Sequence, residues 1–230
     1  LGALQKRPNA TGSDGTRASV PSEDPPPRTD RLRLTRTGSL MARLPLDPRL
    51  ARMLIEAQRQ KCLADITVIA AALTIADPRE RPAERTAEAD RAHGGFVDPV
   101  SDFITLLNIW NRYHTLVSAK ASNSSRRRFC REHFLSFKRM REWRDIHRQI
   151  IVILKDYGIS SDRTRKRAPA ENLNLDPEHS RYEAIHKSIL SGFLSNIAQR
   201  KEKVFYQATK GREAMVFPGS GLFESPPPWM

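Results

Sequence analysis

The chain has 230 residues and a formal net charge of +13 at pH 7, and 39% of its residues are hydrophobic. A charge so far from neutral favours nucleic acid or an anionic surface as the partner of the protein. No run of about 18 or more apolar residues occurs, so we expect no bilayer-spanning segment, no membrane partner and a cytoplasmic location.

The first 46 residues predict a disordered stretch followed by short elements. The chain begins without Met and without a charged region before an apolar core, which predicts a piece of a longer protein and no signal peptide. Residues 8–30 contain five prolines and almost no large apolar side chain, a composition typical of disorder. Residues 31–35 alternate polar and apolar and predict a strand. Residues 37–38 predict a turn, and residues 39–44 predict one or two helical turns.

Four further segments predict a helical bundle between residues 47 and 200. Asp47 before Pro48 is a favourable helix start, because Asp caps free N–H groups and Pro is tolerated in the first turn. Apolar periodicity predicts helices at 47–60, at 63–75, at about 101–121 and at 179–198, and the second of these is apolar on all sides. Charged or polar stretches near 79–99 and 160–176 predict loops.

Residues 126–157 combine a basic surface with an apolar seam. Nine Lys or Arg stand against three acids between residues 126 and 148. Apolar side chains recur every three or four positions, at Cys130, Phe134, Phe137, Met140, Trp143, Ile146, Ile150, Ile153 and Tyr157. The pattern predicts a helix or helix pair, capped by Gly158, that packs on one side and meets a polyanion on the other.

The basic positions of this stretch are candidates for binding nucleic acid. Guanidinium groups pair with phosphate oxygens in a bidentate fork. The candidates are Arg126, Arg127, Arg128, Arg131, Lys138 and Arg141. The alternatives are a solvated face without a ligand and ion pairs with neighbouring acids such as Glu132. Trp110, Tyr113 and Trp143 have rings that stack on bases, but their apolar positions favour the core.

Several kinds of chemistry are not indicated. Cys62 and Cys130 lack a second Cys or His at metal-ligand spacing, so we expect reduced, buried thiols and no metal site. The chain has no Gly-x-x-x-x-Gly-Lys-Ser/Thr phosphate loop, no Asp-Glu pair after an apolar strand and no Gly-x-Ser-x-Gly. ATP hydrolysis needs a phosphate cradle and a metal ligand together. We therefore expect no catalytic residue and no bound cofactor in this chain.

The pattern changes again after residue 200. Short apolar runs at 204–207 and 214–217 predict strands, and a Pro-Gly-Ser-Gly sequence then predicts a turn. We expect residues 201–230 to be the beginning of a β module.

Six phrases occur in collinear order along the chain. They are LPLDPR at 44–49, IAAAL at 69–73 with DPRERP at 77–82, SDF at 101–103, FC at 129–130 with FL at 134–135, REW at 141–143, and IH at 185–186 with LSG at 190–192. Together they resemble the region that follows the motor in DEAH-box RNA helicases, in particular the bacterial HrpA branch. FPGS at 217–220 is similar to the place where an OB-fold strand of that family turns. The resemblance covers nearly all of residues 31–230 except the polar loops.

The resemblance implies a mainly α fold with three modules. These are a partial winged helix at 1–46, a helical ratchet-like bundle at 47–200 and the first strands of an OB-fold barrel at 201–230. It implies single-stranded RNA as a partner, together with RecA-like helicase domains that bind ATP and Mg and normally belong to the same polypeptide. Because the ratchet and OB modules line the RNA channel in that family, Lys187, Lys210, Arg212 and Ser220 are further nucleic-acid-binding candidates.

We therefore interpret the chain as a single-stranded RNA-binding accessory region of an ATP-dependent RNA helicase, inactive by itself. Its phosphate contacts would be independent of sequence and weakened by salt. An alternative is a helical protein-interaction module whose basic face docks an acidic partner. A third interpretation is a fragment without activity, whose truncated modules would unfold without cooperativity.

Overall fold

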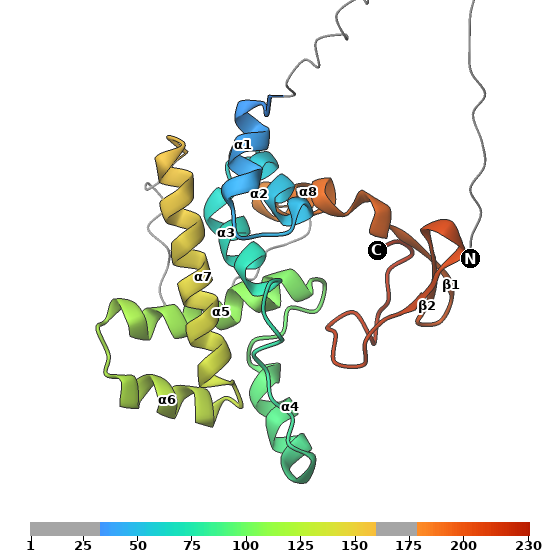
Figure 1. Cartoon of the computed structure of the whole chain (residues 1–230). Helices are drawn as coiled ribbons and strands as arrows, with labels where there is room; N and C mark the ends of the chain where they lie inside the picture. The colour runs from blue at the N-terminus through green and yellow to red at the C-terminus, as the bar shows by residue number, and fades with distance from the viewer. Residues whose placement is uncertain (1–32, 160–178) are drawn as a thin grey trace, which may run out of the picture. The chain divides into compact units, whose positions relative to one another are not determined.

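The computed structural model describes residues 33–159 and 179–230. Within those ranges the chain forms eight α-helices and one three-stranded antiparallel sheet (Figure 1), which confirms the mainly helical fold. Residues Leu34–Met230 form one compact unit. The predicted insertion at 8–30 and the predicted loop at 160–176 lie outside the described residues.

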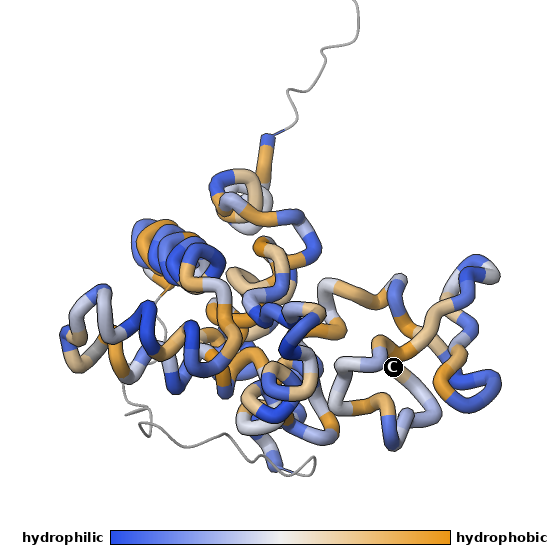
Figure 2. Tube along the Cα trace, turned by 90° about the horizontal axis from the view of Figure 1, so that it is seen from below, coloured by the Kyte–Doolittle hydropathy of each residue, from blue (hydrophilic) through white to orange (hydrophobic). Residues whose placement is uncertain are grey.

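Helix α3 (Leu63–Ala72) is buried on nearly every side, as its apolar sequence predicts. It packs against α2 (Pro48–Arg59), α5 (Asp102–Ser118), α7 (Phe137–Asp156) and α8 (Ser180–Phe193). Figure 2 shows the hydrophobic positions toward the middle of the helical part and many hydrophilic ones at its periphery. The four predicted helices between residues 47 and 198 are therefore confirmed, although the last one ends at Phe193 and is followed by the short helix η2 (Leu194–Asn196).

Two tryptophans form the aromatic centre of the core. The ring centroids of Trp110 and Trp143 lie 5.1 Å apart, and both side chains are at most 1% exposed. Trp143 Nε1–H donates a hydrogen bond to the carbonyl oxygen of Val68 at 2.9 Å. Tyr113 is equally buried. These three aromatic residues are core side chains, as their sequence positions favour.

Helix α1 (Arg36–Arg43) begins earlier than the sequence predicts. The Thr35 hydroxyl accepts a hydrogen bond from the N–H of the third helical residue and caps the helix. Leu40 and Leu44 are both buried in the helical core, and their spacing of four suits a helix. The turn predicted at 37–38 is therefore wrong. Residues 33–35 of the predicted strand 31–35 do not form a strand, and residues 31–32 lie outside the described residues.

The charged stretch near 79–99 is not a loop throughout. It contains the short helix η1 (Ala83–Arg85) and α4 (Thr86–Gly94). Ala89 and His93, four residues apart, are both buried, while most of the charged side chains around them stay exposed. Burial of Ala89 and a hydrogen bond from the buried His93 to the carbonyl oxygen of Phe134 thus accompany a helix in a stretch whose composition predicts a solvated connection.

The basic stretch forms the second of the two predicted alternatives, a helix pair. Helix α6 (Asn123–Glu132) begins before Arg126, because the Ser122 hydroxyl accepts a hydrogen bond from the N–H of Ser125 at 3.1 Å. The chain turns between α6 and α7 at Phe134, which has φ +49, so this residue is not part of a continuous helical seam. Gly158 follows α7 with φ +71, the left-handed geometry predicted for the cap.

The C-terminal strands form a small sheet in the order β1-β2-β3. The strands are β1 (Ala198–Glu202), β2 (Phe205–Ala208) and β3 (Glu213–Met215), with the short helix η3 (Thr209–Gly211) between the last two. The sequence predicts β2 and β3 but not β1, whose sequence AQRKE is mostly charged and exposed. This strand forms because it pairs with β2 on one side and hydrogen-bonds to Met230 on the other. These partners are distant in the sequence, so the local pattern does not predict the strand.

A buried ion pair joins α3 to α8. Arg181 donates hydrogen bonds from Nε and Nη2 to the two carboxylate oxygens of Asp65, at 3.0 and 2.7 Å. The side chain of Asp65 is only 5% exposed. Because a buried carboxylate without its partner is strongly unfavourable, this pair couples the position of α8 to that of α3.

We predict that Arg181→Met lowers the free energy of unfolding by about 3–5 kcal/mol, since it leaves the Asp65 carboxylate buried and unpaired. The control is Lys187→Met, which removes the exposed pair between Lys187 and Glu183 on the same helix. That change costs about 0.3–0.5 kcal/mol. Urea unfolding followed by circular dichroism measures both, and equal losses would contradict the prediction.

His186 fastens α8 to the start of α5. Its Nδ1–H donates to the carbonyl oxygen of Tyr182 at 2.8 Å, and its Nε2 accepts from the hydroxyl of Ser101, the α5 N-cap, at 2.8 Å. Burial lowers the pKa of His186 below its ordinary value of 6.5. The neutral ring is therefore the form that the folded chain favours.

We predict that the melting temperature falls as the pH drops below about 6.5, because the unfolded chain then takes up a proton at His186 that the folded chain resists. The melting temperature of His186→Gln should change less than that of the parent between about pH 7.5 and pH 5.5. Burial raises the pKa of nearby Asp98, which acts in the opposite direction at lower pH. Equal pH dependence in the two proteins would contradict the assignment.

Candidate nucleic-acid interface

The six basic candidates at 126–141 lie on two adjoining helices. Arg126, Arg127, Arg128 and Arg131 belong to α6, and Lys138 and Arg141 belong to the first turns of α7. We call these six residues the basic face. All but Arg126, which is half-buried, are exposed. The turn at Phe134 packs α7 against α6, so the two helices that carry these candidates are neighbours.

An aromatic ring joins the two helices of the basic face. The guanidinium carbon of Arg127 lies 5.1 Å from the centroid of the Phe137 ring, and that of Arg141 lies 6.0 Å from it. Such contacts hold an arginine by its flat face and leave its N–H groups free to donate. Two arginines from different helices are thus positioned around one ring.

Few acids neutralise the basic face. Arg128 pairs with Glu132 at 2.7 Å, one of the ion pairs that the sequence allows. With the other residues that the structure describes, Arg127, Arg131, Lys138 and Arg141 form no ion pair. The face therefore presents four cations whose charge is not offset by a direct partner.

Buried polar atoms lie beneath this face. The hydroxyl of Tyr113, Nε of Arg126 and Nε of Arg144 have no hydrogen-bond partner among the described residues. Burial raises the pKa of Tyr113, and the positive charges of Arg144, Arg126 and Arg141 act against that rise. Arg144, which the sequence analysis does not single out as a candidate, is half-buried, and its charge is offset by an ion pair with Asp145 at 3.3 Å.

The remaining candidates lie elsewhere. Lys187 is on α8 and pairs with Glu183 at 2.6 Å. Lys210 and Arg212 lie in the connection between β2 and β3, where Arg212 donates to the carbonyl oxygen of Ser195. The structure does not gather these three residues with the basic face.

Ser220 lines a cavity of about 400 Å³. One wall is the segment from Asp77 to Val97, and the other is the loop Phe217–Gly221 that follows β3. These walls contain two of the phrases that carry the family resemblance, 77–82 and 217–220. Residues almost 140 positions apart thus face one cavity, which the sequence analysis does not predict.

Ion pairs fix the side chains on the first wall. Arg79 donates from Nη2 to Asp77 Oδ2 at 2.6 Å, and Arg81 donates from Nη2 to Asp90 Oδ2 at 2.7 Å. Burial would raise the pKa of Asp77, but the hydrogen bonds and charge of Arg79 outweigh it and hold that pKa below its ordinary value. Both acids that line the cavity therefore pair with an arginine of the same wall.

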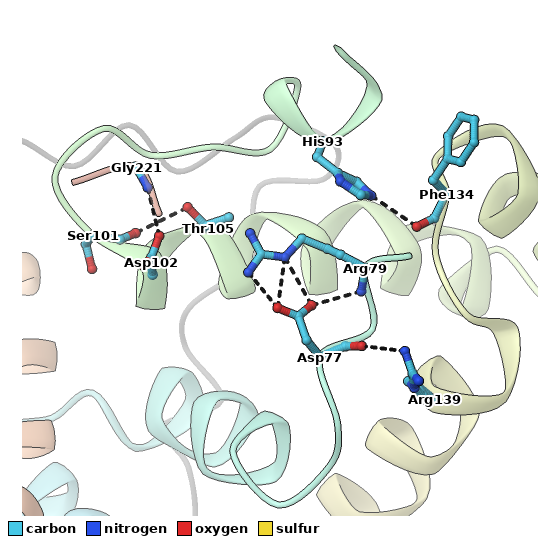
Figure 3. Close-up of polar contacts among 9 residues, drawn as sticks. All are labelled: Asp77, Arg79, His93, Ser101, Asp102, Thr105, Phe134, Arg139 and Gly221. Carbon is cyan, nitrogen blue, oxygen red and sulfur yellow. Dashed lines mark hydrogen bonds and ion pairs between the residues drawn. The ribbon is translucent and has the colours of Figure 1, made fainter. Parts of the chain in front are cut away.

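Hydrogen bonds join the cavity to the basic helices and to α5 (Figure 3). Arg139 of α7 donates to the carbonyl oxygen of Asp77 at 2.9 Å, and His93 Nε2–H donates to the carbonyl oxygen of Phe134 at 3.0 Å. The N–H of Gly221 donates to Asp102 Oδ1, in the first turn of α5, at 3.1 Å. The cavity is therefore adjacent to the first turn of α7, which carries Lys138.

The sequence analysis misses Arg79, Arg81 and Phe217 as candidates for a site. Arg79 and Arg81 stand in a phrase with equal numbers of acids and bases, which gives no charge signal. Phe217 is assigned to a strand, but β3 ends at Met215 and the ring is 63% exposed. An aromatic residue beside Pro-Gly-Ser-Gly is the one local signal that distinguishes this loop.

Two features are absent from the described residues, a cluster of metal-ligating side chains and a helix that could span a membrane. Nowhere in residues 33–159 and 179–230 do three or more His, Cys, Asp or Glu side chains gather in a way that could hold a metal ion. In the same ranges, no helix has the length and apolar character needed to cross a membrane.

Comparison with known proteins identifies related sequences. Residues 47–144 match the helicase associated domain (HA2), ratchet-like, and this range contains the whole basic face. The chain is 38% identical over 199 residues to the ATP-dependent RNA helicase HrpA of Escherichia coli, and 37% identical over 198 residues to the HrpA homolog of Haemophilus influenzae. Each alignment covers 86% of this chain but only 14% of the relative.

We predict that Gly221→Ala loosens the loop that forms one wall of the cavity. A Cβ at this position would clash with the carbonyl oxygen of Asp98, which is backbone and cannot rotate away. The change should cost about 1–3 kcal/mol of stability and speed hydrogen exchange at the Gly221 amide. Gly94→Ala is the control, because a Cβ there meets nothing within 4 Å. Equal exchange rates in the parent and Gly221→Ala would contradict this anchoring.

Proposed function

This chain contains the ratchet-like HA2 domain and corresponds to a region of HrpA-type ATP-dependent RNA helicases, and on that premise we propose that it binds single-stranded RNA. The binding would be made mainly by the basic face on α6 and α7. The observation that carries the proposal is the set of four exposed cations, Arg127, Arg131, Lys138 and Arg141, that lack an acidic partner among the described residues.

The physical basis is neutralisation of phosphate charge. Each cation that contacts a phosphate releases condensed counterions, so the binding is favourable at low salt and largely independent of sequence. Phe137 holds Arg127 and Arg141 before RNA arrives. Side chains that are already ordered lose less conformational entropy on binding, which favours the contact.

The chain spans about one seventh of the length of its curated relatives. We therefore propose an accessory role, in which RecA-like domains of a longer protein bind ATP and Mg and hydrolyse ATP while this region holds the RNA strand. The winged-helix end at 1–46 and the OB-fold beginning at 201–230 remain predictions within this proposal. Lys187, Lys210, Arg212 and Ser220 would be contacts outside the basic face.

Fluorescence anisotropy of a labelled single-stranded RNA across a salt series tests the proposal. For a single strand, each phosphate contact contributes about −0.7 to the slope of log K against log salt. The double variant Arg127→Gln, Arg141→Gln should therefore bind more weakly and have a slope shallower by about 1.4. Stability should change by less than about 0.5 kcal/mol, because both side chains are exposed.

The matched control is Arg52→Gln, Arg59→Gln, which removes the same charge from one half-buried and one exposed position on α2, both paired with Glu56. It should leave the slope close to that of the parent. Affinity that does not change with salt, or equal losses in both double variants, would overturn the proposal. Binding of an acidic protein that single-stranded RNA cannot displace would favour the protein-interaction alternative.

A further inference from the structure

The cavity beside Ser220 differs in chemistry from the basic face. Its arginines, Arg79 and Arg81, are each paired with an acid of the same wall. Four charged side chains therefore cancel in pairs, and His93 is the only other ionisable residue among those that line it. A cavity with balanced charge has no net attraction for phosphate, but it offers both hydrogen-bond donors and acceptors.

An aromatic ring is available at the rim of this cavity. Phe217 is 63% exposed although it lines the cavity, so part of its ring is free. The ring lies close to its own loop, because a Cβ at Gly219 would be only 2.7 Å from Cε1 of Phe217. Glycine at this position therefore allows the ring to lie against the turn. The N–H of Gly221 fixes the other end of the loop to Asp102.

The size of the cavity also limits its ligand. At about 400 Å³ it falls in the range of roughly 300–1,000 Å³ that is usual for sites of small organic ligands. It is thus too small for a folded partner but large enough for one nucleoside. A planar ring with a polar edge would use the free aromatic surface and the fixed arginine and aspartate groups together.

We propose that this cavity receives one base of the bound single-stranded RNA. The base stacks on Phe217, and its polar edge faces the paired groups Arg81 and Asp90, which present a guanidinium donor and a carboxylate acceptor side by side. This inference rests on the proposed function, because the RNA strand that supplies the base is the one held by the basic face.

The connections between the two sites support a shared strand. Arg139 of α7 bonds to Asp77 at the cavity, and Lys138 and Arg141 lie within two residues of Arg139 along the helix. The backbone of residues 78–80 is also bonded to the turn between α6 and α7, through Glu80 to Phe134 and Ser136 to Pro78, both at 2.8 Å. A strand whose phosphates contact the first turns of α7 therefore passes close to the cavity.

The test compares two labelled strands of equal length, an oligoadenylate RNA and the same ribose-phosphate backbone without bases. The parent chain should bind the oligoadenylate at least about fivefold more tightly, as stacking of one base on an aromatic ring predicts. Phe217→Ala should remove most of this preference and leave the affinity for the abasic strand unchanged. Gly219→Ala should have the same effect while it keeps the aromatic residue, because the new Cβ displaces the ring.

The matched control is Phe205→Ala, since Phe205 is also an exposed aromatic residue of the β segment, at 53%, but does not line the cavity. It should keep the preference of the parent. An unchanged preference in Phe217→Ala, or an equal loss in Phe205→Ala, would overturn the inference and leave phosphate binding by the basic face intact.

A second measurement does not depend on the basic face. Adenosine, which has no phosphate, is titrated into the isotope-labelled chain, and the amide signals of Gly219 and Gly221 are followed by NMR. Both should shift in the parent and stay fixed in Phe217→Ala. If no RNA strand binds but these signals shift, the proposed function fails and the base site stands. If the signals do not shift in the parent, the base site is wrong.

Discussion

The fold depends on one constraint, the burial of α3 on all sides. A helix with almost no polar surface must be covered all round, and here α2, α5, α7 and α8 cover it. Asp65, the one acid on this helix, is tolerated only because Arg181 of α8 binds both of its oxygens. This pair makes the position of α8 specific, since a shifted helix would leave a buried charge without a partner.

The position of the basic face follows from the same constraint. α7 directs Met140, Trp143, Ile150 and Leu154 into the core, so the other side of the helix must face solvent with its lysine and arginines. The turn at Phe134 then places α6 beside the first turns of α7. Phe137, at the join, lies close to arginines of both helices. Packing against α3 thus determines where the cations gather.

Arginine has two different roles in this chain. On the basic face its charge is mostly without a direct acidic partner and is therefore available to an external anion. At the cavity Arg79 and Arg81 hold acids of their own wall, so they act as fixed hydrogen-bonding groups with little net field. The two sites would consequently respond differently to salt, because counterion release accompanies phosphate contacts and not base stacking. In these proposals, that difference would separate phosphate binding by the basic face from base binding in the cavity.

The sequence by itself determined the parts of this protein that follow from periodicity and capping. Apolar spacing predicted α2, α3, α5, α7 and α8. The helix start at Asp47-Pro48 and the cap at Gly158 are local effects that the sequence also predicts. Charge density identified the basic face. The sequence did not determine α4, whose single stripe of Ala89 and His93 is outweighed by charged neighbours, or β1, which forms only through pairing with β2 and Met230. Nor could it identify the cavity, because its walls are at least 120 residues apart and the side chains that line it carry balanced charges and no motif of known chemistry. Only tertiary packing brought the loop Phe217–Gly221 to the same cavity as Arg81, since that placement depends on Gly221 docking against the start of α5.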